Sequence, residues 1–113
     1  MTARATSRLL IQALIRATQA DGGFAAVLHK GDDNAGAILV QSRNPGAELK
    51  LFERQPDFSK GYTLTPIATQ SWGNEIELAQ YIERRRRSDP DLWIIELDSA
   101  NAERLAAAIM TQG

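Results

Sequence analysis

Four short strand-like segments in the first part of the chain restrict its fold more than any other feature. They occupy residues 23–30, 36–42, 48–54 and 62–68. The segments 31–36 (GDDNAG) and 43–46 (RNPG) between them are rich in glycine, asparagine, aspartate or proline, which favour turns. This spacing predicts consecutive antiparallel hairpins and therefore a meander. The first two strand segments are apolar on both faces, so we expect them nearest the centre of the sheet.

Three further segments have the periodicity of amphipathic helices. They occupy residues 6–23, 74–87 and 97–110. At the start of the second segment, Asn74 and Glu77 match a capping box, in which each side chain satisfies an amide at the helix N-terminus. Within that segment, Ile76, Ala79 and Ile82 predict a buried stripe.

The run LWIIEL at residues 92–97 is the most strand-like in the chain. It follows Pro90, which must lie beyond the second helix because proline lacks an amide hydrogen and restricts the residue before it. Together the elements predict an α+β fold with a mostly antiparallel five-stranded sheet and three helices, in the order α-β-β-β-β-α-β-α. We expect residues 92–97 to extend the meander and the first two helices to cover one face. The terminal helix should lie at an edge or on the same face.

Length and composition predict a single domain over residues 1–113. The hydrophobic fraction of 43% and the charged fraction of 24% are close to those of globular proteins. No apolar run reaches the roughly 20 residues that cross a bilayer, and the N-terminus lacks the pattern of a secretory signal. We therefore expect a cytoplasmic protein without membrane contact. The broad apolar stripe of the first helix predicts cover on more than one side, so a homodimer is also an expectation.

Residue types that the sequence lacks exclude several kinds of chemistry. There is no cysteine, which excludes disulfides, thiol nucleophiles and zinc–thiolate or iron–sulfur sites. His29 is the only histidine, so a catalytic triad or a histidine base would depend on it. It ends an apolar strand segment next to a turn, which favours a partly exposed strand residue over a base. We predict no cofactor and no metal site, and the residues favour a non-enzymatic role over an enzyme.

Four consecutive arginines close the second predicted helix: Arg84, Arg85, Arg86 and Arg87. Successive helical residues point about 100° apart, so these side chains spread around the helix instead of forming one basic stripe. Cations in a last helical turn are stabilised by the helix dipole, and Glu83 can pair with Arg87. With a formal net charge of −1, the pattern favours a solvated helix end. An anion or nucleic-acid site formed by this run and Lys30 is the alternative.

The order of predicted elements also resembles the core of the restriction-endonuclease-like nucleases. In that family the metal site uses an aspartate followed by Glu-x-Lys on the next strand. Here Asp33 precedes the second strand segment, and Glu48 and Lys50 open the third. The resemblance implies a magnesium-dependent nuclease as a second alternative, in which the carboxylates hold the ion and Lys50 orients the attacking water. However, alternating acids and lysines are also normal on an exposed strand face, and that core does not require the fourth strand segment.

Two kinds of side chain remain to be interpreted. Glu96 lies within the 92–97 run, and its apolar neighbours favour pairing with an arginine, such as Arg54 or one of residues 84–87. Trp72 and Trp93 are interpreted as packing residues and not as platforms for stacking bases.

Four stretches carry a resemblance to a known family: GGFAAVLHKGD at 22–32, AGAILV at 35–40, LFER at 51–54 and DPDLWIIELD at 89–98. Across essentially the whole chain, they resemble a family of small proteins, found mainly in alphaproteobacteria, that is known as a domain of unknown function. The resemblance implies a stand-alone cytoplasmic protein and supplies no activity, substrate or catalytic residue. The leading hypothesis is a non-enzymatic binding or protein-interaction module with an unidentified protein partner. We expect its contact surface to include residues 84–87 and 31–36.

Overall fold

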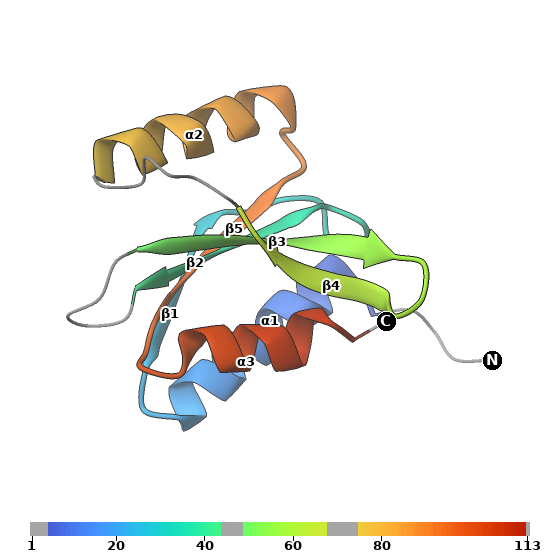
Figure 1. Ribbon diagram of the computed structural model, residues 1–113, viewed down its shortest axis with the longest axis vertical. Helices are drawn as coiled ribbons and strands as arrows, with labels where there is room; N and C mark the ends of the chain where they lie inside the picture. Colours follow the sequence, from blue (N-terminus) through green and yellow to red (C-terminus); the bar gives the residue numbers. More distant parts are fainter. Residues whose placement is uncertain (1–4, 44–48, 68–74, 113) are drawn as a thin grey trace.

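The architecture confirms the α+β class and the element order that the sequence predicts. The computed structural model describes residues 5–43, 49–67 and 75–112. Within these ranges, three helices and five strands follow in the order α-β-β-β-β-α-β-α (Figure 1). They are α1 (Ser7–Ala20), β1 (Phe24–His29), β2 (Ile38–Arg43), β3 (Lys50–Asp57), β4 (Gly61–Pro66), α2 (Glu75–Ser88), β5 (Trp93–Asp98) and α3 (Ala102–Met110).

The sheet is mixed, and its strand order is not that of a meander. The order is β1-β5-β2-β3-β4, with β5 antiparallel to β1 and parallel to β2. The antiparallel pairs β2–β3 and β3–β4 confirm the later part of the predicted meander. The predicted β1–β2 hairpin is wrong, because β5 lies between these two strands. As a result β2 is central, as expected, whereas β1 lies at an edge.

The glycine-rich segment between β1 and β2 accommodates this insertion. Residues 31–36, called the docking loop below, pack against the start of β5 instead of forming a hairpin turn. The Asp32 amide donates to the Asp91 carbonyl at 3.0 Å. A Cβ atom on Gly31 or Gly36 would overlap the oxygen of that same carbonyl. Both positions therefore need glycine for a close backbone approach.

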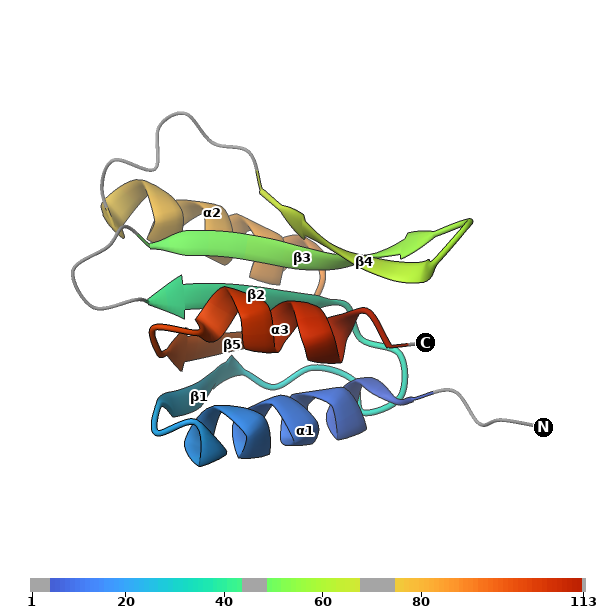
Figure 2. The ribbon, with the colours of Figure 1, turned by 60° about the horizontal axis from the view of Figure 1, so that its bottom comes forward.

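Helices cover both faces of the sheet. α1 and α3 lie on one face and α2 lies on the other, as Figures 1 and 2 show. The expectation that α1 and α2 share a face is wrong, because β2 and β5 are apolar on both faces and each face needs cover. On β2, Val40 packs in the cluster under α1 and α3, and Leu39 packs in the cluster under α2. On β5, Ile95 packs in the cluster under α1 and α3, and Ile94 packs in the cluster under α2.

α2 buries a narrower face than the sequence predicts. Leu78 is buried, and Tyr81 and Ile82 are partly buried against the same cluster. Ile76, expected on the buried stripe, is 69% exposed. The capping residue Asn74 lies outside the described residues. Few apolar side chains thus hold α2 on the sheet. Its polar contacts with the sheet therefore matter more for its attachment.

Candidate functional site

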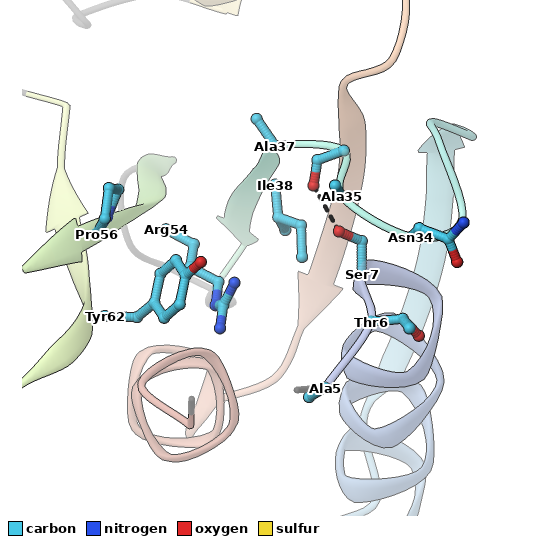
Figure 3. Close-up of a pocket in the computed structure, with 11 residues that line it drawn as sticks. Ala5, Thr6, Ser7, Asn34, Ala35, Ala37, Ile38, Arg54, Pro56 and Tyr62 are labelled. Atoms are coloured by element: carbon cyan, nitrogen blue, oxygen red, sulfur yellow. Dashed lines mark hydrogen bonds between the residues drawn. The ribbon is translucent and has the colours of Figure 1, made fainter. Parts of the chain in front are cut away.

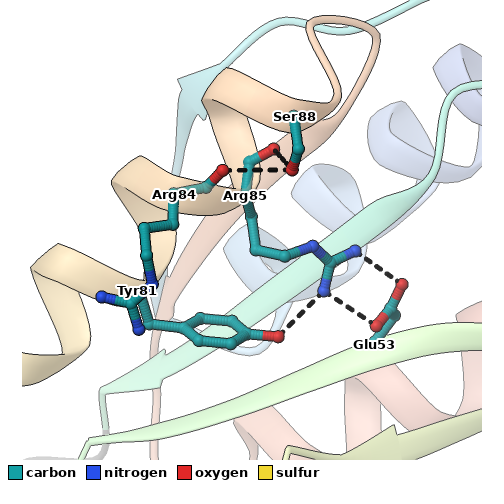
Figure 4. A network of polar contacts seen from close by, with 5 residues as sticks. All are labelled: Glu53, Tyr81, Arg84, Arg85 and Ser88. Atoms are coloured by element: carbon teal, nitrogen blue, oxygen red, sulfur yellow. Dashed lines mark hydrogen bonds and ion pairs between the residues drawn. The ribbon is translucent and has the colours of Figure 1, made fainter.

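Arg85, from the predicted basic run, forms a bidentate ion pair with the sheet (Figure 4). Its Nη1 and Nη2 donate to the two carboxylate oxygens of Glu53 at 3.0 and 2.8 Å, and Nη1 also donates to the Tyr81 hydroxyl at 3.0 Å. The hydrogen bonds to Glu53 hold the pKa of Arg85 above its usual range, although burial opposes this. Only 24% of the Arg85 side chain and 17% of the Glu53 side chain are exposed. Arg85 therefore fastens α2 to β3.

The other three arginines lie at the surface of α2. Arg86 and Arg87 both pair with Glu83, at 3.2 and 3.5 Å, which confirms the predicted Glu83–Arg87 pair. The Arg84 guanidinium lies 5.9 Å from the centre of the Tyr81 ring. Exposed pairs of this kind stabilise a helix by only about 0.3–0.5 kcal/mol each, but they offset part of the charge that an anion would meet.

Lys30 is exposed directly after β1 ends. Its neighbour His29 has Nδ1 2.6 Å from the Leu92 carbonyl oxygen, at the start of β5. Because a carbonyl only accepts, Nδ1 carries the hydrogen of this bond. The partly exposed His29 thus confirms the interpretation as a strand residue. Lys30 lies at the end of the sheet where α2 also ends. An anion site shared by Lys30 and residues 84–87 stays a proposal.

The structure does not bring Asp33 and Lys50 together. Asp33 lies in the docking loop before β2, where its carbonyl accepts from the Arg8 amide at 3.0 Å. Lys50 begins β3 beside the far end of β2, and its Nζ pairs with Glu103 of α3 at 2.8 Å. Glu48 lies outside the described residues. Among the residues that are described, no group of three or more acids or histidines could hold a metal ion.

Glu96 is paired, as predicted, but with different partners. Its Oε2 accepts from Gln41 Nε2 at 2.7 Å, and its Oε1 accepts from Arg43 Nε at 3.3 Å. Arg43 also reaches Glu75, at the start of α2, at 3.3 Å. Arg54 is not the partner, because alternation along β3 directs it to the face that α3 covers.

The tryptophan of β5 confirms its interpretation as a packing residue. Trp93 is 4% exposed, and its Nε1 donates to the Asp32 carbonyl in the docking loop at 2.6 Å. Trp72 lies outside the described residues.

The outer edge of β1 is a surface that the sequence did not predict. Within the described ranges, β5 is the one strand that neighbours β1. Phe24, Val27 and Leu28 are 75%, 39% and 50% exposed. The opposite edge strand, β4, ends in Pro66, and proline is one of the residues that protect an edge from further pairing. β1 contains neither proline nor a lysine, arginine or acid, so its edge is suited to accept another strand.

Comparisons with known proteins identify related chains. The model of the family DUF1491, described as a protein of unknown function, matches residues 5–107. The solution structure of a protein from A. tumefaciens is 32% identical, with a TM-score of 0.68, over 86% of this chain and 87% of that chain. The crystal structure of a DUF1491 family protein from Caulobacter crescentus is 29% identical, with a TM-score of 0.76, over 88% of this chain and 92% of that chain. The NMR structure of a DUF1491 family protein from the same organism is 28% identical, with a TM-score of 0.77, over 92% of this chain and 94% of that chain.

No curated protein matches the chain. In the part of the chain that the structure describes, no helix combines the length and apolar character needed to cross a membrane.

Proposed function

We propose that this chain, which belongs to the DUF1491 family of proteins of unknown function, is a protein-interaction module that pairs with a second copy of itself through β1. The observation that carries the proposal is a mismatch: β1 has the composition of a central strand and the position of an edge strand. Edge strands that remain single usually have a charge, a proline or a bulge that discourages pairing. In β1 the register with β5 is regular from Phe24 to Val27 and shifts at Leu28, between Val27 and His29, so four of the six residues of the strand keep a regular ladder.

An antiparallel pairing suits the side chains of this strand. With Ala26 at a two-fold axis, Ala25 of one copy lies opposite Val27 of the other, and Phe24 lies opposite Leu28, the residue at which the register of β1 with β5 shifts. Each pair joins two apolar side chains, and such cross-strand pairs stabilise neighbouring strands. The exposed Phe24 and Leu28 would both be covered.

Charge favours the same orientation. Lys30 follows the end of β1, whereas Asp21 precedes its start and Asp98 lies beside Phe24 on β5. Antiparallel pairing brings Lys30 of each copy towards Asp21 and Asp98 of the other, which complements their charges. Inside a single chain, and among its described residues, no ion pair involves any of these three side chains.

We assign the contact to β1 in preference to residues 84–87 and the docking loop. Arg85 has Glu53 as its partner, and the docking loop packs on Asp91. Both surfaces thus make contacts within the chain, whereas four of the six residues of β1 are exposed.

Leu28→Lys should shift the protein from dimer to monomer. A lysine at this position would face Phe24 of the partner. Because the contact is symmetric, the substitution occurs in it twice, and two apolar contacts are lost. We expect the dissociation constant of the dimer to rise by about tenfold or more, which corresponds to about 1.4 kcal/mol. Sedimentation equilibrium at several protein concentrations measures this constant.

Ile76→Lys is the matched control for this experiment. Ile76 is also an exposed apolar residue, but it lies on α2, which among the described residues packs over β2, β3 and β5 and not over β1. Its replacement should leave the dissociation constant unchanged. A wild-type chain that sediments as a monomer at every concentration, or equal dissociation of the two variants, would reject pairing through β1.

A further inference from the structure

A pocket of about 330 Å³ opens between the start of α1, the docking loop and the β3–β4 hairpin (Figure 3). Its lining includes five apolar side chains: Ala5, Ala35, Ala37, Ile38 and Pro56. Arg54 and Tyr62, from the two neighbouring strands, are its polar side chains on the hairpin side. Sites for small molecules commonly combine an apolar lining with a few well-placed polar groups.

Arg54 is held in a fixed orientation at this pocket. Its guanidinium carbon lies 3.4 Å from the centre of the Tyr62 ring. Its Nε donates to the Met110 carbonyl at 2.8 Å, and its Nη2 donates to the Gln112 carbonyl at 2.6 Å. A ligand would therefore meet a preorganised cation and would lose little affinity to the ordering of this side chain.

The Arg54 guanidinium lacks the counter-charge that the other partly buried arginines have. Arg85 pairs with Glu53 and Arg43 pairs with Glu96, but no ion pair of the described residues includes Arg54. Its two carbonyl acceptors are neutral. Burial lowers the pKa of Arg54 from its usual value, although Tyr62 opposes this. A partly buried cation without a carboxylate is stabilised when a ligand supplies the negative charge.

The available donors favour a carboxylate over a phosphate. At the start of α1, the amides of Ser7 and Arg8 donate to docking-loop carbonyls, and the Leu9 amide donates to the Thr6 hydroxyl. The helix therefore offers the pocket few of the amide donors that a phosphate needs. On the guanidinium, the Nε hydrogen and one of the two Nη2 hydrogens already have carbonyl partners. Nη1 and the Tyr62 hydroxyl can serve the two oxygens of a carboxylate, whereas a phosphate presents further acceptors.

We propose that this pocket binds a small organic monocarboxylate, with its carboxylate group on Arg54 and Tyr62 and its hydrocarbon chain along Ala37, Ile38 and Pro56. The apolar wall accommodates an alkyl chain, and the single uncompensated cation matches a single negative charge. The site is distinct from the outer edge of β1 and does not require a second copy of the chain.

Titration of the wild-type protein with hexanoate, followed by NMR of the backbone amides, tests the site. We expect saturable shifts at pocket residues such as Ser7, Ala35 and Ile38, with a Kd on the order of 1 mM. Hexanamide, which has the same chain without the charge, should bind about tenfold more weakly or worse. Inorganic phosphate should cause no shifts at these residues. Equal binding of hexanoate and hexanamide, phosphate binding in the pocket, or no saturable shifts for any acid from butanoate to octanoate would overturn the proposal.

Two variants locate the binding within the pocket. Arg54→Met removes the charge and should weaken hexanoate binding by about tenfold or more. Arg54 also anchors the C-terminal residues, so its replacement changes more than the pocket. Ala35→Leu therefore serves as a second variant, in which a larger side chain at an exposed position narrows the pocket. Ala35→Leu should weaken octanoate binding more than butanoate binding. Unchanged binding in a folded Arg54→Met protein, or in Ala35→Leu if Arg54→Met does not fold, would place the acid elsewhere.

Discussion

Replacement of Gly36 by alanine should lower the free energy of unfolding by about 3 kcal/mol, and the midpoint of thermal unfolding by more than about 10 °C. The new Cβ would overlap the Asp91 carbonyl oxygen and lie 3.0 Å from backbone atoms of Asp32. Because these neighbours belong to the backbone, they cannot rotate away as a side chain would. The docking loop must shift, and its contacts with the start of β5 weaken. Thermal and urea denaturation, each followed by circular dichroism, measure the effect.

Two further substitutions test this explanation. Gly31→Ala should act like Gly36→Ala, because its Cβ would overlap the same carbonyl oxygen. Ala35→Ser, at an exposed position of the same loop, should change the free energy of unfolding by less than about 0.5 kcal/mol. If both glycine variants stay within about 1 kcal/mol of the wild type, close packing of the loop does not hold β5 in place.

The docking loop also marks the limit of what local sequence patterns can predict about this sheet. The turn residues at 31–36 correctly separate β1 from β2, because they favour a bend in the chain. A hairpin and a loop that packs on a third strand can share the same glycine-rich composition. Which of these two structures forms depends on contacts between residues that are distant in the sequence, such as the hydrogen bond of 2.7 Å from the Trp93 amide to the Ala37 carbonyl. No local pattern encodes such contacts.

The candidate pairing surface could not be predicted for the same reason. Phe24 and Leu28 lie in a segment with the composition of a buried strand, and this composition predicts a position near the centre of the sheet. Their exposure follows from the insertion of β5, which leaves β1 with an open outer side. The pocket at Arg54 likewise depends on the approach of α3 to β3, which joins residues 56 positions apart.

For the arginine run, by contrast, helix geometry predicts part of the arrangement correctly. Divergence of the four side chains was predictable, and so was the pairing of Arg87 with Glu83 one turn away. The partner of Arg85 was not predictable, because Glu53 lies 32 residues earlier in the chain. Helix periodicity indicates which side chains point inward, but it cannot identify the strand residue that they meet.

Glu53→Ala should lower the free energy of unfolding by about 2–3 kcal/mol, because it leaves the Arg85 cation partly buried without a carboxylate. The Tyr81 hydroxyl would be its remaining partner among the described residues. Since α2 buries few apolar side chains, we also expect its amide hydrogens to exchange faster than those of α1 and α3. Urea denaturation measures the loss of stability, and hydrogen exchange resolved by residue shows whether α2 loosens first.

A double-mutant cycle separates the ion pair from the loss of each side chain. Arg85→Met combined with Glu53→Ala removes the uncompensated charge, so we expect a coupling energy of about 2 kcal/mol. Glu83 and Arg87 are the matched control, because their side chains are 48% and 78% exposed on the same helix. Their coupling should be below about 0.5 kcal/mol. If the two cycles gave similar small values, the apolar face alone would hold α2 on the sheet, and Arg85 would return to the candidate ligand-binding residues.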